Sequence, residues 1–257
     1  MTRRRWIADA VSGNRAFLFG EHAAHLTRVL RARIGQSFDI SAHGLLRRGA
    51  IVSLAVDRVE FELGEEILQP SNPPVTLALS IFKYDRMEWA IEKCTELGVA
   101  RIIPVMARRT DAHLIASAPK RLERWQRIAR EASEQSRRLT PPEFAGPLPV
   151  KDAAALQAPS RILLSEVETE VALADFVRGQ LIRQDVIGQD ISVRDLSAPD
   201  LSVRDTILAV GPEGGWAPEE LSLFSESGWS SVSLGPTILR AETAAIAATA
   251  IVMANLA

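Results

Sequence analysis

Three prolines within five positions, Pro70, Pro73 and Pro74, divide the chain into two parts with different hydrophobic patterns. Proline fixes its own φ angle and lacks a backbone donor, so this run continues neither a helix nor a central strand. We interpret the segment from Gln69 to Pro74 as a linker. Two domains also suit a chain of 257 residues. The division predicts a front domain over residues 1–71 and a second domain over residues 72–257.

The front part carries short segments that favour β-structure, several of them separated by glycine. They cover residues 16–19, 37–40, 50–56 and 59–61, and one short helix over about 21–31 interrupts them. Short strands at this spacing are typical of a small β-barrel.

The second part alternates apolar strands with helices. Strands are expected at 75–81, 102–106, 161–164, 206–210 and 231–234, and helices at about 86–97, 119–137, 218–227 and after Arg240. A continuous apolar run such as 75–81 indicates a strand that is buried on both faces. The pattern therefore predicts an α/β fold with a parallel sheet covered by helices on both faces.

A segment from about 185 to 205 interrupts this alternation. Ser192 to Asp195 recurs ten residues later as Ser202 to Asp205. Two copies make a local duplication and not a solenoid. We expect a surface insertion there, mobile or folded as a small hairpin.

Several classes of protein are disfavoured. The single cysteine, Cys94, excludes a disulfide framework and a cysteine-based zinc site, and the four scattered histidines give no reason to expect a metal. No apolar stretch is long enough to span a bilayer, and no apolar run follows the basic start as it would in a signal peptide. We expect a cytoplasmic protein.

The net charge of −2 by itself argues against a nucleic-acid-binding protein. That argument fails when the charge is counted separately for each segment of the chain. Residues 1–59 hold ten arginines against four acids, which gives +6. Residues 101–138 hold nine arginines and one lysine against four acids, again +6, while 185–226 hold two arginines against nine acids, or −7. The two basic segments have the positive charge that contacts with phosphate groups require. The alternative is that these arginines lie on solvated helix faces and bind no ligand.

The strongest local motif is Val210-Gly211-Pro212-Glu213-Gly214-Gly215-Trp216, between a buried strand and a helix. Its glycines and proline indicate a tight loop whose backbone N–H groups approach a ligand closely at a helix N-terminus. It lacks the Gly-Lys-Ser/Thr ending of a Walker A loop and the spacing of a dinucleotide fingerprint. The alternative is a loop that only turns the chain.

A second motif, Leu234 to Ala244, again leads from a strand into a helix, here an alanine-rich one. It places Arg240 and Glu242 at the start of that helix. Charges in apolar surroundings must be paired or functional, although Glu242 also favours the helix dipole as a simple cap.

Three further motifs are weaker one by one. Glu131 to Arg138, followed by two prolines, ends the long helix, and its arginines also suit the helix dipole. Lys83 to Glu88 forms a charged turn after a buried strand, where α/β proteins bind ligands. His25 to Arg31 lies in the front part, and His25 there is expected to be structural.

Taken in order, these five motifs resemble the 16S ribosomal RNA uridine-N3-methyltransferases of the knotted SPOUT class. The resemblance extends over almost the whole chain, and the insertion at about 185–205 is its main departure. It implies a PUA-like RNA-binding barrel at the front, followed by an α/β domain that contains a trefoil knot. It also implies a homodimer without a metal, with an S-adenosylmethionine pocket at the subunit interface.

The resemblance further assigns residues to roles. The expected cofactor-binding residues are Leu164, Glu166, Gly211, Pro212, Glu213, Gly214, Gly215, Leu234, Gly235, Ile238, Leu239 and Arg240. The expected RNA contacts, on 16S ribosomal RNA within the small subunit, are Arg3, Arg4, Arg5, Arg28, Arg31, Lys83 and Arg86.

The acceptor would be N3 of a uridine, whose proton must leave before or during attack. Arg240 and Arg138 are the candidates for stabilising the uridine anion, and Glu242 for orienting an arginine or accepting the proton. Two alternatives stay open: another RNA acceptor such as a transfer RNA ribose 2′-hydroxyl, or a catalytically silent RNA-binding scaffold.

Overall fold

The structure, a computed structural model, describes residues 5–68, 73–188 and 205–256, without the side chains of 181–188. Arg3, Arg4, most of the linker and most of the expected insertion lie outside the described residues. The chain forms two compact units. Unit 1 comprises Met1–Ser71 with Arg130–Pro141, and unit 2 comprises Asn72–Ala129 with Pro142–Ala257. The sequence did not indicate that 130–141 joins the front unit.

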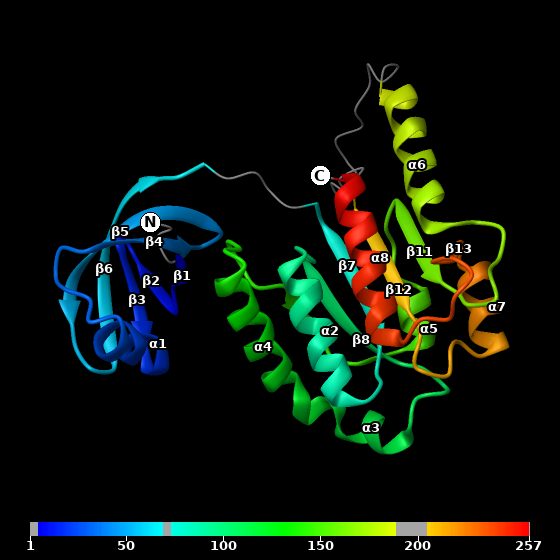
Figure 1. The fold of residues 1–257 in the computed structure, drawn as a ribbon, viewed down its shortest axis with the longest axis horizontal. Helices are drawn as coiled ribbons and strands as arrows, with labels where there is room; N and C mark the ends of the chain where they lie inside the picture. The colour runs from blue at the N-terminus through cyan, green and yellow to red at the C-terminus, as the bar shows by residue number, and fades with distance from the viewer. Residues whose placement is uncertain (1–4, 69–72, 189–204, 257) are drawn as a thin grey trace. The chain divides into compact units, whose positions relative to one another are not determined.

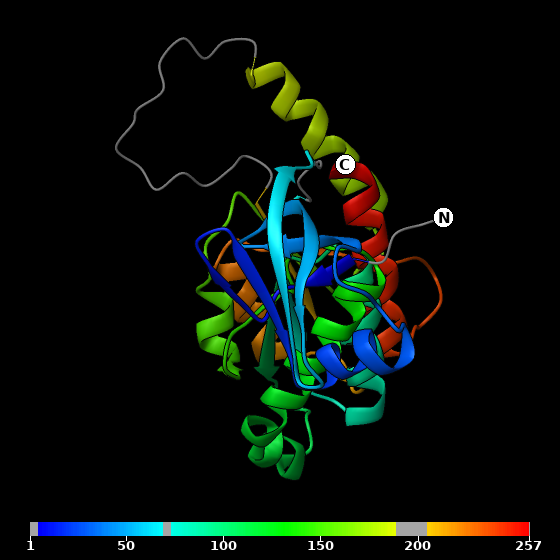
Figure 2. The same cartoon turned by 90° about the vertical axis from the view of Figure 1, so that its left-hand side faces the viewer.

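Unit 1 is built on a six-stranded sheet in the order β1-β4-β5-β6-β3-β2. The strands are β1 (Arg5–Ile7), β2 (Ala10–Ser12), β3 (Arg15–Phe19), β4 (Ser37–Ala42), β5 (Leu45–Leu54) and β6 (Arg58–Glu66). The edge strand β1 runs parallel to β4, and the other pairs are antiparallel. Figure 2 shows β5 and β6, the longest pair, side by side. The expected strands are confirmed, while β1 and β2 were not anticipated.

The helix expected at about 21–31 is confirmed, but it is short and irregular. α1 (Gly20–Ala24) continues directly into a π-helical turn, His25–Val29. Leu26 is buried with Leu18, Ile40 and Phe61 in the core of the unit. A π-helical turn is rare in proteins and frequently lies at a functional site.

Unit 2 contains a parallel sheet in the order β10-β8-β7-β12-β11-β13, with the short β9 beside β8 (Figure 1). The strands are β7 (Val75–Ser80), β8 (Arg101–Met106), β9 (Glu143–Phe144), β10 (Leu148–Pro149), β11 (Ser160–Leu164), β12 (Thr206–Val210) and β13 (Ser230–Val232). All recorded pairs in this sheet are parallel, as the apolar runs predict.

Helices cover both faces of this sheet. They are α2 (Tyr84–Glu96), α3 (Ala112–Ser117), α4 (Leu122–Gln135), α5 (Val150–Ala154), α6 (Leu173–Gly188), α7 (Pro218–Glu226) and α8 (Ala241–Leu256), with a 3₁₀ turn at Ala118–Arg121. Residues of α2, α3, α4, α6 and α8 share one core with β7 and β11, and residues of α5 and α7 form the core on the other face. The α/β prediction is confirmed.

The order of the strands brings distant loops together. β11 lies between β12 and β13, so the segments that follow these three strands leave the same edge of the sheet. Ser233 N donates to Val171 O and Ser233 O accepts from Leu173 N, both at 2.9 Å, so the segments after β11 and β13 lie side by side and form a parallel bridge between Ala172 and Ser233. The chain after β13 then reaches α8, which packs against α2.

Candidate functional site

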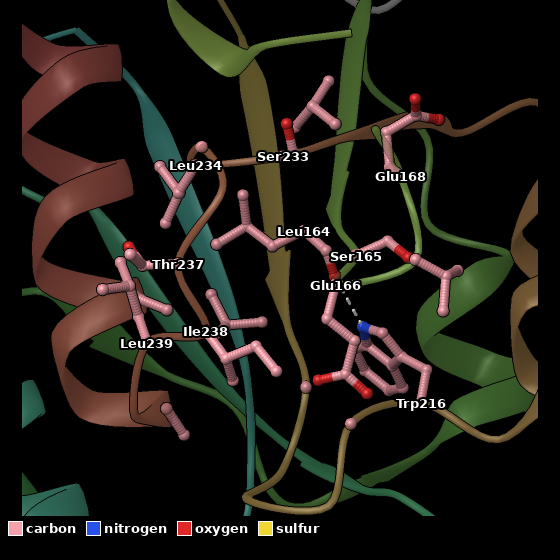
Figure 3. A pocket seen from close by; sticks show the side chains of 18 of the residues that line it. Leu164, Ser165, Glu166, Glu168, Trp216, Ser233, Leu234, Thr237, Ile238 and Leu239 are labelled. Atoms are coloured by element: carbon pink, nitrogen blue, oxygen red, sulfur yellow. Dashed lines mark hydrogen bonds between the residues drawn. The ribbon is translucent and has the colours of Figure 1, made fainter. Parts of the chain in front are cut away.

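A pocket lies at the ends of β11, β12 and β13. The segments that follow these three strands form its walls, with a contribution from the start of α8 (Figure 3). A parallel sheet binds ligands at this edge, where the loops at the carboxyl ends of its strands converge.

The glycine-rich loop between β12 and α7 forms one wall, and two of its glycines are required by their surroundings. Gly215 has a φ of +69°, and a Cβ there would lie 2.2 Å from Oε1 of Glu166. A Cβ on Gly211 would lie 3.2 Å from Nε1 of Trp216. At Gly214 a Cβ would make an ordinary contact, 3.5 Å from Arg109. The loop therefore approaches its neighbours more closely than residues with side chains allow.

Trp216 fixes this loop to the segment that follows β11. Its buried indole donates from Nε1 to the carbonyl of Leu164 at 3.1 Å, as Figure 3 shows. The ring also packs edge-on against Phe224 of α7, with centroids 5.0 Å apart. The sequence motif includes Trp216, but the sequence analysis did not assign it to the pocket. The feature that could have indicated this role is a large aromatic side chain directly after two glycines.

The segment between β13 and α8 forms an apolar wall. Leu234, Gly235, Ile238 and Leu239 all line the pocket, as the resemblance implies. Ile238 is 86% exposed, so the structure presents a bare aliphatic side chain at the pocket. Apolar surface of this kind is suited to a ligand with an apolar face.

Of the twelve expected cofactor-binding residues, ten line the pocket. The exceptions are Gly214 and Arg240. Gly214 accepts a hydrogen bond from Nη1 of Arg109 through its carbonyl at 2.7 Å, and Arg240 is exposed at the start of α8. Sequence reasoning missed several lining residues, among them Glu168, Leu221 and Thr237.

A second arginine holds the same loop. Nη1 of Arg86, in the first turn of α2, lies 2.8 Å from Oε1 of Glu213. Nε of Arg86 lies 3.8 Å from Oε1 of Glu242. The guanidinium expected to contact RNA therefore joins two carboxylates of unit 2.

Glu242 is 3% exposed and does not line the pocket. Its Oε2 is buried and has no hydrogen-bond partner among the described residues. The structure thus brings Glu242 to Arg86, which matches the first of its two expected roles, the orientation of an arginine.

The remaining predicted residues lie in several places. Arg138 belongs to unit 1, where it is 9% exposed and burial lowers its pKa to about 10. Arg5 is 8% exposed, and its guanidinium donates to the carbonyl of Arg137. Arg28 and Arg31 are exposed in and just after the π-helical turn, and Lys83 is exposed immediately before α2.

A network of four charged groups ties residues 130–134 to the strands and helix of unit 1. His22 lies between two carboxylates, with Nδ1 3.6 Å from Oδ2 of Asp9 and Nε2 3.5 Å from Oε2 of Glu134. Arg130 approaches the same two carboxylates, at 2.8 Å from Asp9 and 3.4 Å from Glu134. The hydrogen bond to Asp9 raises the pKa of His22, and burial raises the pKa of Glu134.

Within 5–68, 73–188 and 205–256, no three His, Cys, Asp or Glu side chains are placed to hold a metal ion. No helix of the described chain is both long and apolar enough to cross a membrane.

Comparisons with known proteins relate the chain to RNA methyltransferases. Residues 69–253 match the family described as RNA methyltransferase domain. Proteins named Ribosomal RNA small subunit methyltransferase E are similar to this chain. The one from Synechocystis is 34% identical over 86% of this chain and 66% of that protein, and the one from Mycobacterium tuberculosis is 31% identical over 92% and 85%.

Solved structures agree with these matches. The methyltransferase E of Neisseria gonorrhoeae, bound to S-adenosyl methionine, has a TM-score of 0.73 and 27% identity, covering 97% of this chain and 96% of that one. A chain from Legionella pneumophila, solved in complex with the bound cofactor SAM, has a TM-score of 0.77 and 26% identity, covering 99% and 98%.

Proposed function

The chain belongs to the ribosomal RNA small subunit methyltransferase E family, and we propose that it methylates N3 of a uridine in 16S ribosomal RNA, with S-adenosylmethionine as methyl donor. The observation that carries this proposal is the pocket at the ends of β11, β12 and β13, in a chain whose structural relatives were solved with that donor bound. Donor and ribosomal substrate come from the relatives' names, and the choice of uridine N3 comes from the family resemblance.

The pocket residues suit the donor. Leu164, Leu234, Ile238 and Leu239 provide apolar walls for an adenine ring, and the loop around Gly211 and Gly215 provides backbone groups at close range. When bound, S-adenosylmethionine supplies an activated methyl group, so the reaction requires no metal and no covalent nucleophile. The task left to the chain is to position both substrates and to stabilise the charge that develops on the base.

We assign the stabilisation of the uridine anion to Arg240. Its guanidinium is exposed in the residue directly before Ala241, which lines the pocket. Glu242 supports this region by holding Arg86, and Arg138 remains the second candidate for contact with the anion. N3 lies on the base-pairing edge, so the uridine must be unpaired or flipped out when it reacts.

We further propose that unit 1 is a PUA-like RNA-binding domain. Arg28, Arg31 and Arg33 are exposed on one segment, and their guanidinium groups have no ion pair within the described chain. Free guanidinium groups are suited to phosphate oxygens. Since the substrate is ribosomal RNA, we place the protein in the cytoplasm.

We also propose that the chain acts as a homodimer, with the trefoil knot of the SPOUT class in unit 2. A largely apolar groove runs between α2 and α8, and Trp89 at its edge is 49% exposed. A second copy seated on this groove would bury the indole. The knot is carried over to unit 2 from the family resemblance.

Mass mapping of ribosomal RNA from cells that lack this protein tests the activity. We expect one N3-methyluridine of 16S RNA to disappear, and purified protein with isotopically labelled donor to restore it on isolated small subunits. Loss of a ribose methyl group from transfer RNA would instead support the alternative acceptor. Absence of donor binding in calorimetry would support the non-catalytic scaffold.

A further inference from the structure

The pocket is lined by charged side chains of one sign only. Its charged lining residues are Glu166, Glu168 and Glu213, and no lysine, arginine or histidine lines it in the part of the chain that the structure describes. A pocket of this composition attracts a cation and disfavours an anion.

Two of these carboxylates are already engaged. Glu213 accepts a hydrogen bond from Arg86, whose charge neutralises its own. Glu168 accepts hydrogen bonds from the backbone N–H groups of Glu170 at 2.8 Å and Val171 at 3.1 Å, and these bonds lower the pKa of Glu168. Each of these two carboxylates therefore already accepts hydrogen bonds from the protein at its Oε1.

Glu166 differs from both. No described residue forms a hydrogen bond or an ion pair with its carboxylate. The carboxylate lies directly against the glycine-rich loop, because a Cβ on Gly215 would be 2.2 Å from Oε1 and 2.7 Å from Cδ. In Figure 3 it points from the end of the segment after β11 into the middle of the pocket.

The backbone that carries this carboxylate is tied to the glycine-rich loop. The bond from Trp216 to Leu164 O fixes the backbone two residues before Glu166, and Gly215 leaves the space that the carboxylate occupies. Glu166 is exposed, so its carboxylate can meet a cationic ligand without first breaking a contact within the described chain.

We propose that Glu166 is the specificity residue that distinguishes the cationic methyl donor from the product, an inference that rests on the proposed function. Transfer breaks the sulfur–methyl bond and leaves its electron pair on sulfur, forms the bond between the methyl carbon and N3, and releases the N3 proton to solvent. The sulfonium thereby becomes a neutral thioether, and the remainder of the molecule is unchanged. A carboxylate near the sulfur therefore raises the affinity of the pocket for the cationic donor. It adds no affinity for the neutral thioether product.

Calorimetry with three ligands tests this assignment: S-adenosylmethionine, S-adenosylhomocysteine, and sinefungin, which carries a protonated amine in place of the sulfonium methyl. In Glu166→Gln we expect the Kd of the two cationic ligands to rise about tenfold, while that of S-adenosylhomocysteine changes less than about twofold. Unchanged product binding also demonstrates that the variant pocket is folded.

The matched control is Glu170→Gln, which removes an exposed acid of the same segment that does not line the pocket. All three ligands should bind it as they bind the unaltered protein. Equal weakening of donor and product in Glu166→Gln would overturn the inference, because Glu166 would then hold a part that both molecules share. No weakening of either would overturn it too. A failure of the unaltered chain to bind any donor would instead refute the proposed function.

Discussion

Nη1 of Arg86 lies 2.8 Å from Oε1 of Glu213, across 127 positions of sequence. The first turn of α2 thereby holds the glycine-rich loop by a charge-assisted hydrogen bond. The same guanidinium faces the buried Glu242, so one arginine connects the loop to the start of α8. These are the two segments that form opposite walls of the pocket.

Replacement of this arginine should weaken both the fold and the site. Arg86→Ala leaves the Glu242 carboxylate buried without a cation, and we expect the free energy of unfolding in urea to fall by about 2 kcal/mol. Donor binding should weaken about tenfold, since Glu213 loses its partner.

Adding Glu242→Gln to Arg86→Ala should restore part of the stability, because the buried carboxylate is then replaced by a neutral amide. Arg108→Ala, which breaks an exposed pair with Glu219, should change stability by less than about 1 kcal/mol, and an equal loss in both variants would contradict our interpretation.

Two neighbouring glycines should respond differently to alanine. Gly215→Ala forces a side chain into a left-handed conformation and displaces the Glu166 carboxylate, so we expect donor affinity to fall about tenfold. Gly214→Ala meets only an ordinary contact with Arg109, and its affinity should stay within about threefold of the unaltered protein. Calorimetry measures both. Similar losses in the two variants would show that the whole loop, and not the space at Gly215, limits binding.

The His22 network predicts a dependence of stability on pH. A raised pKa means that the folded state holds the imidazole proton more tightly than the unfolded state. Protonated His22 therefore adds to the free energy of unfolding. Its stabilising effect is fully present below about pH 6.5 and is lost as pH rises through the raised pKa of His22 in the folded state. Urea denaturation at several pH values between about 6 and 9 should show stability falling with pH. The groups that face His22 are Asp9, Glu134 and Arg130.

His22→Gln should abolish most of that decline. The matched control is His113→Gln, which changes an exposed imidazole of unit 2 and should leave the slope as it is. A slope that survives in His22→Gln would assign the effect to another group.

Cys94 should be inert in the folded protein. Burial raises the pKa of its thiol to about 12, so the thiolate that reacts with alkylating agents is scarcely populated near neutral pH. We expect no labelling by iodoacetamide at about pH 8 in buffer and complete labelling in concentrated urea, followed by mass spectrometry. Rapid labelling of the folded chain would mean that α2 opens locally from its neighbours.

The groove between α2 and α8 should determine the association state. Trp89→Glu places a charge on the half-exposed edge of this groove, and sedimentation should then report a monomer in place of the proposed dimer. Val56→Glu introduces the same charge at an exposed apolar residue of unit 1 and should leave association unchanged. A dimer that persists in Trp89→Glu would place the interface elsewhere.

Local patterns were sufficient to predict much of this structure. The continuous run at 75–81 predicted a buried strand, and β7 is buried because both faces of the sheet are covered. The glycines at 211–215 predicted a loop of close approach, and the space at Gly211 and Gly215 agrees with that expectation. Such features depend on neighbouring residues, and a single sequence therefore contains them.

The tertiary structure alone decided which distant segments meet. It moved residues 130–141 into unit 1, placed Trp216 and Ser165 in one pocket, and paired Arg86 with Glu213 and Glu242. Among the three carboxylates that line the pocket, it also left Glu166 without a hydrogen bond or ion pair to any described residue. Spacing along the chain does not encode these relations, because the partner of a charged side chain depends on strand order and helix packing. The sequence by itself therefore determined the elements and the glycine-rich loop, and the fold determined which charges remain free to meet a ligand.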